Sequence, residues 1–167
     1  MRVRGGWIAA VAACAVVLSA VPTSAAWTDN EWTKGSGLSA TTIPPATLSK
    51  PCVYNPGVLG LGAKITIYWR APAGYALANS VMYASQSGLG SVLAPLTGFS
   101  MTTSTTVSGA DYVTDVPVNL LGGLLGLGAE LELAIVMKNG TWTSVPVKVK
   151  ANPGLVGGLG GSCTNIG

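Results

Sequence analysis

Residues 57–67 read GVLGLGAKITI, and residues 123–133 repeat the phrase almost intact as GLLGLGAELEL. In each copy a glycine- and leucine-rich run passes directly into a segment in which apolar and polar side chains alternate. Alternation with a period of two is typical of a strand with one buried face. The repeat therefore predicts two strands, at 64–70 and 130–138, that each follow a Gly/Leu loop.

Short strand signals separated by turn residues fill the middle of the chain, and no segment has a helical period. Strands are expected at 46–54, 64–70, 79–85, 111–120, 130–138 and 141–150, and residues 91–107 should hold a short strand or two. The first should be an edge strand, because Pro51 cannot donate to a central ladder. The expected inward side chains are Ile65, Ile67, Trp69, Tyr112, Val116, Val118, Leu120, Leu131, Leu133, Ile135, Met137, Val145, Val147 and Val149, and Val81 should share one face with Tyr83. About seven antiparallel strands predict a single all-β, Ig-like β-sandwich over residues 46–151.

The last two predicted strands are joined by a hairpin that contains an Asn-Gly pair. A two-residue loop there would mix the two faces, because a slip of one residue turns every side chain over. We therefore expect a three-residue loop at 138–140, with Gly140 in the left-handed conformation as part of a bulge. The register that follows pairs Leu133 with Val145, Leu131 with Val147, and Glu130 with Lys148.

The N-terminus has the three parts of a secretory signal peptide. Arg2 and Arg4 precede the apolar run IAAVAACAVVLSAV, and the small residues PTSAA follow it. We expect residues 1–26 to be removed by cleavage near Ala25 or Ala26, and the mature chain, without a transmembrane segment, to be secreted or held at the cell surface. Subtracting these two arginines from the nine basic residues leaves seven against six acidic ones. A net charge of about +1 gives no basic patch for nucleic acid.

The chain has three cysteines, of which Cys14 lies inside the predicted signal peptide. Cys14 also suggests a lipidation site, but the apolar run continues beyond it, which a lipoprotein signal does not favour. Cys52 and Cys163 remain as an even pair in an oxidising compartment, and they predict one disulfide rather than two free thiols.

Residues 27–45 are polar, end in two prolines and predict a mobile or extended N-terminal arm. Trp27 and Trp32 in this arm are candidate contact residues. The stretch AAWTD at 25–29 resembles the Ala-x-aromatic-(Ser/Thr)-Asp motif of proteins exported with a SipW-type signal peptide. Those proteins include biofilm-matrix fibre subunits of the TasA kind and many small exported proteins of actinobacteria. The resemblance implies an export route in a bacterium rather than an activity.

The segments ITIYWRAPAG, VMYAS and LELAIVMKNGTWTSVPVKV resemble a fibronectin type III domain over residues 46–151. In that family a strand tryptophan precedes a proline-containing turn, and the last two strands include a Ser-x-Pro segment. Trp69, Pro72 and residues 144–146 match these features, whereas Leu131 stands where the family has its corner tyrosine. The resemblance implies an Ig-like sandwich without the hydrogen bond of that corner.

The residue types needed for common catalytic sites are sparse. The chain contains no histidine, which excludes Ser-His-Asp and Cys-His machinery and the ordinary zinc sites. Glu130 and Glu132 share a strand face, where they fit either a solvated face with lysine partners or, less well, a glycosidase pair. Asp111 and Asp115 suggest calcium, but DYVTD lacks the dense Asp/Asn/Gly pattern of a calcium loop. We therefore expect no enzyme, no cofactor and no metal.

Strand order and parity bring four Gly/Leu segments to one end of the sandwich, namely 58–62, 85–93, 120–128 and 153–162. The disulfide would tie the Gly-rich tail, residues 152–167, beneath the same end. The leucines there either close the end of the core or form an exposed apolar patch that contacts a partner. The residues that decide between these readings are Leu59, Leu61, Leu124, Leu125 and Leu127.

These observations favour a secreted or cell-surface structural or interaction protein without enzymatic activity. It would contact a protein or an envelope component, or assemble with itself, through the Gly/Leu end or through the N-terminal arm. Trp142 is a further candidate contact, unless it packs over the sheet edge on Lys or Arg stems. The alternative function is a small-ligand module for lipid or glycan.

Overall fold

The computed structural model describes residues 42–58, 61–85, 92–121, 130–152, 154 and 160–167. The chain divides into two units, Met1–Ser39 and Ala40–Gly167, and every described residue belongs to the second unit. The predicted signal peptide therefore lies outside the described residues, as do Trp27 and Trp32 of the predicted arm. Ile43, near the end of that arm, is buried with the core side chains.

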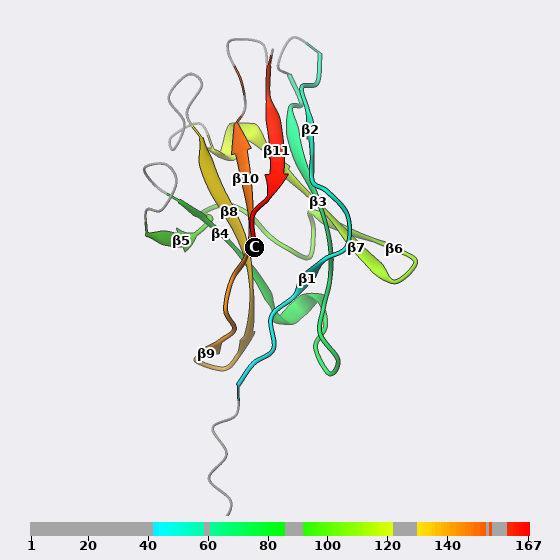
Figure 1. Cartoon of the computed structure of the whole chain (residues 1–167), viewed down its shortest axis with the longest axis vertical. Coiled ribbons are helices and arrows are strands. Elements are labelled where there is room, and N and C mark those ends of the chain that lie inside the picture. Colours follow the sequence, from blue (N-terminus) through cyan, green and yellow to red (C-terminus); the bar gives the residue numbers. More distant parts are fainter. Residues whose placement is uncertain (1–41, 59–60, 86–91, 122–129, 153, 155–159) are drawn as a thin grey trace, which may run out of the picture. The chain divides into compact units, whose positions relative to one another are not determined.

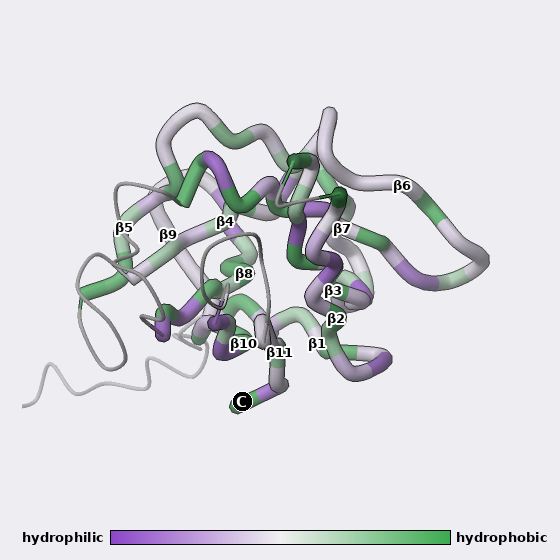
Figure 2. Tube along the Cα trace, turned by 90° about the horizontal axis from the view of Figure 1, so that it is seen from above, coloured by the Kyte–Doolittle hydropathy of each residue, from purple (hydrophilic) through white to green (hydrophobic). Residues whose placement is uncertain are grey.

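The described residues form two antiparallel sheets, which Figure 2 shows as two layers seen from above. In the described part of the chain the first sheet has the order β1-β3-β7-β6, with β2 also paired to β3. Its strands are β1 (Thr47–Leu48), β2 (Val53–Asn55), β3 (Lys64–Arg70), β6 (Thr105–Ser108) and β7 (Asp111–Pro117). The second sheet has the order β11-β10-β8-β4-β5, with β9 paired to β8. Its strands are β4 (Ser80–Ser85), β5 (Leu93–Pro95), β8 (Leu131–Asn139), β9 (Trp142–Thr143), β10 (Val147–Asn152) and β11 (Ser162–Asn165).

This strand order confirms the predicted Ig-like β-sandwich. The order β2-β3-β7-β6 corresponds to the ABED sheet of such a fold, and β10-β8-β4 corresponds to its CFG sheet. The predicted central strands, β3 and β8, are central in opposing sheets (Figure 1). The described residues contain more strands than expected because predicted strands are interrupted and because β11 forms in the predicted tail. Lys50 and Pro51 separate β1 from β2, and residues 144–146 separate β9 from β10.

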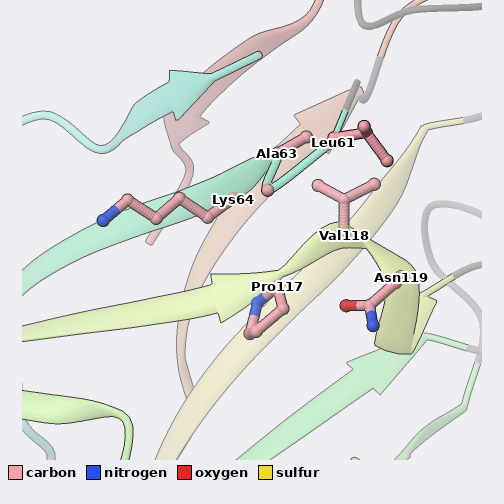
Figure 3. Close-up of a pocket in the computed structure, with 7 residues that line it drawn as sticks. Leu61, Ala63, Lys64, Pro117, Val118 and Asn119 are labelled. Atoms are coloured by element: carbon pink, nitrogen blue, oxygen red, sulfur yellow. The ribbon is translucent and has the colours of Figure 1, made fainter. Parts of the chain in front are cut away.

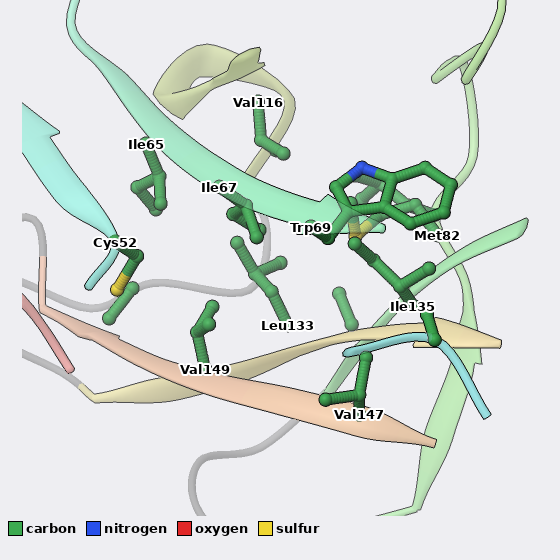
Figure 4. Close-up of a cluster of buried hydrophobic side chains, with 14 of the residues drawn as sticks. Cys52, Ile65, Ile67, Trp69, Met82, Val116, Leu133, Ile135, Val147 and Val149 are labelled. Carbon is green, nitrogen blue, oxygen red and sulfur yellow. The ribbon is translucent and has the colours of Figure 1, made fainter. Parts of the chain in front are cut away.

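The core lies between the sheets and follows the predicted alternation in β3 and β8 (Figure 4). Side chains of β3 alternate inward at Ile65, Ile67 and Trp69, and all three are fully buried. The Trp69 indole N–H donates to the hydroxyl of Thr114 at 2.8 Å, so its one polar atom is satisfied inside the core. The odd-numbered residues of β8, which face the core, are Leu131, Leu133, Ile135 and Met137.

Two other predicted faces differ in detail. Val81 and Tyr83 do share one side of β4, but they are only partly buried, whereas Met82 and Ala84 enter the core. After β7 the chain turns into the short 3-10 helix η2 (Val118–Leu121), which ends the two-residue period. Leu121 is therefore fully buried instead of the predicted Leu120. A second 3-10 helix, η1 (Leu77–Asn79), leads into β4.

The predicted hairpin register is wrong. Asn139 pairs with Trp142, which leaves a two-residue loop, although Gly140 does adopt the left-handed conformation at φ 59°. The faces are matched instead by a bulge, in which the three residues 144–146 lie opposite the two residues 136–137. The bulge turns Val145 outward, and it is 71% exposed rather than inward.

Together, the two-residue turn and the bulge shift the pairs along the two strands from the predicted register. Leu133 pairs with Val149 and Leu131 with Ala151, instead of with Val145 and Val147. Outside the core, Lys148 binds Glu132 at 3.0 Å and Lys150 binds Glu130 at 3.2 Å, so the predicted contact of Glu130 with Lys148 is also wrong.

The predicted disulfide is present and joins the two sheets at one side of the sandwich. Cys163 belongs to β11, a strand that the sequence analysis had left in the tail, and it is bonded to Cys52 beside β2. The Asn165 side chain continues this closure, because it accepts from the Cys52 amide at 3.1 Å and donates to the Lys50 carbonyl at 3.0 Å. Figure 2 shows β11 on the side of the second sheet nearest β1 and β2.

Candidate interaction surfaces

The strand ends that flank the four Gly/Leu segments lie at one end of the sandwich, as predicted. In the second sheet, β8 begins beside the ends of β4 and β10, with Leu133 opposite Ala84 and Leu131 opposite Ala151. In the first sheet, β3 begins at Lys64 beside the end of β7. Figure 1 shows these strand ends together at the top of the view. We call this end of the sandwich the Gly/Leu pole.

Large aliphatic side chains at the pole are open to solvent. Val58, Leu61 and Val92 are 76%, 79% and 84% exposed, respectively. Leu61 is the one decisive leucine that the structure describes, and it is not buried. The other four, Leu59, Leu124, Leu125 and Leu127, lie outside the described residues.

A cleft of about 600 Å³ opens beside Leu61, between the start of β3 and the end of β7. Figure 3 shows the side chains of Leu61 and Val118 pointing toward one another, while that of Lys64 extends away from them. The Lys64 ammonium instead binds Asp115 at 2.6 Å on the outer face of the first sheet. The other lining residues are Gly62, Ala63, Pro117 and Asn119. The cleft is thus an apolar surface without a free charge directed into it.

The opposite end of the sandwich carries the β8–β9 hairpin (Figure 1). Trp142 is 73% exposed there, because it pairs with Asn139 beyond the last core residue of β8, Met137. A second groove, of about 430 Å³, runs between β1 and the bulge that precedes β10. Sequence reasoning missed this groove because it had placed Val145 in the core.

Each described carboxylate on the first sheet is held by basic side chains. Asp111 accepts from the Arg70 Nε at 2.5 Å, and the Lys50 ammonium lies 3.9 Å away. The hydrogen bond from Arg70 holds the pKa of Asp111 below its ordinary value, although partial burial of the carboxyl acts in the opposite direction. Asp115 accepts from Lys64 and from the hydroxyl of Thr66, both at 2.6 Å. Asp111 and Asp115 therefore form separate ion pairs rather than one cluster.

The carboxylates of the second sheet are arranged in the same way. Glu130 and Glu132 each bind a lysine of β10 on the outer face, which fits the solvated-face interpretation except that Glu132 is buried beneath its partner. Across the described ranges, no three His, Cys, Asp or Glu side chains gather in a way that would hold a metal ion. The geometry on both sheets is that of ion pairs that stabilise a surface.

The fold and these surfaces define an Ig-like β-sandwich module closed by a disulfide between its sheets. A formed disulfide fits a protein of an oxidising, extracellular compartment. Among the described residues, no helix has the length and apolar character needed to span a bilayer.

No protein-family model matches the chain, and no curated protein matches its sequence. Among solved structures, chitinase ChiW from Paenibacillus sp. str. FPU-7, a multi-modular enzyme expressed on the bacterial cell surface, aligns with a TM-score of 0.41 and 14% identity. The alignment covers 72% of this chain and 9% of the chitinase chain.

Proposed function

We propose that this chain is a non-enzymatic interaction module of the extracellular space or cell surface that binds a protein partner through the Gly/Leu pole. The observation that carries the proposal is the exposure of Val58, Leu61 and Val92 at one end of a closed sandwich. Apolar side chains that stay in water cost free energy, and a partner that covers them recovers about 25 cal/mol per Å².

The polar parts of the described surface support a role in binding rather than catalysis. The carboxylates on both sheet faces are neutralised by lysine or arginine partners, and the sequence provides no histidine as a base. Export by a secretory signal, which the N-terminal sequence predicts, would place the pole outside the cell.

The test uses the full chain, exported and purified, in two variants. Leu61→Asp places a charge on the pole, and Val145→Asp places one at a residue of similar exposure at the opposite end. Labelled protein is titrated onto envelope fragments of the producing bacterium. We expect Leu61→Asp to weaken binding by about tenfold or more, as for a central contact residue. Val145→Asp should bind like the parent chain. Equal binding by both variants would remove the pole from consideration.

The cleft beside Leu61 favours a second candidate function, the binding of a small apolar ligand such as an acyl chain. Its volume of about 600 Å³ lies within the range of ligand pockets, and apolar side chains line it. Titration with a fluorescent fatty acid distinguishes the two functions. If the cleft binds a ligand, the fatty acid should bind saturably and Val118→Asp should abolish that binding. If this variant still binds envelope fragments as the parent chain does, the exposed aliphatic side chains contact a protein instead.

A further inference from the structure

The sheet edges of the described chain are not equally protected. On one side of the sandwich, β2 and β11 are joined to each other by the Cys52–Cys163 disulfide and by the Asn165 side chain. On the other side, the edge strand β5 spans three residues and ends at Pro95, which cannot donate a hydrogen bond to a neighbour. At the end of the first sheet opposite β1 and β2, the edge strand is β6, which in the described part of the chain pairs with β7 alone.

The ladder between β6 and β7 shows which backbone groups of β6 point outward. The Asp115 amide donates to the Ser104 carbonyl at 2.9 Å. Since hydrogen bonding alternates along an antiparallel ladder, Val113 also bonds toward β6, and its pair Thr106 bonds toward β7. The backbone amide and carbonyl groups of Thr105 and Val107 therefore point away from β7, outward from the edge of the sheet.

The residues of β6 lack the features that normally block an edge. The strand reads TTVS at 105–108, without charge or proline, and three of its four residues are β-branched. Exposed edges usually carry a lysine, a proline or a bulge that prevents pairing with another chain. Val107 is also 69% exposed on the core-facing side of the strand, beyond the reach of the core. Figures 1 and 2 both show β6 at the outer margin of its sheet.

We propose that β6 pairs antiparallel with β6 of a second copy of this chain, across a twofold axis at Thr106. In this register Thr105 lies opposite the partner's Val107, and the outward amide and carbonyl groups of both residues exchange hydrogen bonds. By symmetry the pairing forms about four such bonds. Each Val107 is covered by the partner's Thr105, and no charged side chains of β6 meet. The two first sheets become one continuous sheet.

The occupant is a second copy because the edge is complementary to itself. Its donors and acceptors repeat in the order that a twofold axis requires, and Thr–Thr is a favourable cross-strand pair. The edge lies on a strand separate from the Gly/Leu pole, so the proposal does not depend on what the pole binds. Leu61→Asp should leave the pairing unchanged.

Cysteine cross-linking of the full exported chain tests the register. Thr106→Cys places two thiols across the axis, where the side chains of facing residues are neighbours. Ser108→Cys is the matched control, since Ser108 is also exposed on the same strand. In the proposed register the two Ser108 positions lie about 14 Å apart, four residues along the strand, which a disulfide cannot span. We expect disulfide-linked dimer to form at least tenfold faster for Thr106→Cys, as measured by non-reducing electrophoresis.

Hydrogen exchange on the unsubstituted chain gives a second readout that needs no variant. The amides of Thr105 and Val107 should exchange more slowly as protein concentration rises, whereas that of Thr106, already directed toward β7, should not change. Thr106→Lys should weaken the dimer about tenfold in sedimentation equilibrium, because two ammonium groups would meet at the axis.

Equal cross-linking rates for the two cysteine variants would overturn the proposal, as would exchange that is independent of concentration. Slower exchange at Thr105 and Val107 without cross-linking at Thr106→Cys would also overturn it, because a different strand would then occupy the edge. Cross-linking specific to Thr106→Cys supports it even if the pole proves to have no partner.

Discussion

Breaking the Cys52–Cys163 disulfide should remove a large part of the stability of this domain. The bond closes a loop of 111 residues, which restricts the unfolded chain far more than the folded one. The loop-entropy relation gives about 16 cal/mol/K for a loop of this size, or about 5 kcal/mol at 25 °C. Since small domains are stable by about 5–15 kcal/mol, this is between a third and all of the total.

The assay is urea unfolding of the full exported chain, followed by tryptophan fluorescence. Trp69 is fully buried in the core, so its emission reports the loss of packing between the sheets. Two comparisons separate the covalent bond from the side chains that make it. Oxidised and reduced forms of the same chain differ by the bond, whereas the reduced chain and Cys52→Ala/Cys163→Ala differ by packing around two small side chains.

We expect reduction to lower the free energy of unfolding by about 3–5 kcal/mol, because a compact unfolded state retains part of the loop constraint. The double alanine variant should resemble the reduced chain to within about 1 kcal/mol. A difference below 1 kcal/mol between the oxidised and reduced forms would refute the reasoning. Loss of hydrogen-exchange protection confined to β11, with the rest unchanged, would also refute it, because the bond would then hold only one edge strand.

Two further variants test polar contacts of the sandwich. Ser144→Ala removes the hydroxyl that accepts a hydrogen bond from the buried Met137 amide at 3.0 Å. In urea unfolding this variant should lose about 1–3 kcal/mol of stability, whereas Thr143→Ala at the exposed neighbour should lose less than 0.5 kcal/mol. Equal effects of the two variants would contradict the role of the bulge. Arg70 lowers the pKa of Asp111 in the folded state, so ionised Asp111 stabilises the fold at pH values above its pKa in the unfolded chain. This stabilisation is lost as the pH falls through the pKa of Asp111 in the folded state. Stability should therefore fall less steeply below about pH 4 in Asp111→Asn than in the parent chain, and parallel curves would contradict this contribution.

The parts of the fold that the sequence predicted are those in which local pattern and tertiary structure agree. In β3 the alternation is regular, and in β8 the odd-numbered residues are apolar from Leu131 to Met137; each strand is central in its sheet, so these inward residues meet an opposing layer. The disulfide was predictable because only Cys52 and Cys163 remain once a secretory signal is removed.

The errors arise where the structure depends on distant contacts. The bulge at 144–146 shifts the register by one residue, and it is held by the Ser144 hydroxyl between the Met137 amide and the Val145 carbonyl. Parity counted along the sequence does not detect such a shift. Strand β11 has no apolar alternation, and its position comes from pairing with β10 and from the bond to Cys52. The candidate surface was predicted in part, since strand order located the Gly/Leu pole but not the groove beside Val145.

The distribution of charge decides where this sandwich can gain free energy from a partner. On the outer faces, the described carboxylates already have lysine or arginine partners, so a molecule that covers a face must desolvate those pairs and gains little in exchange. At the Gly/Leu pole, the side chains of Leu61 and Val58 are exposed to water, and the one ion-paired residue that lines the cleft, Lys64, directs its ammonium away to Asp115, so covering the two aliphatic side chains is favourable. In the proposed pairing of β6, its outward backbone groups exchange hydrogen bonds to solvent for hydrogen bonds to a strand at small net cost, and Val107, now exposed, becomes covered.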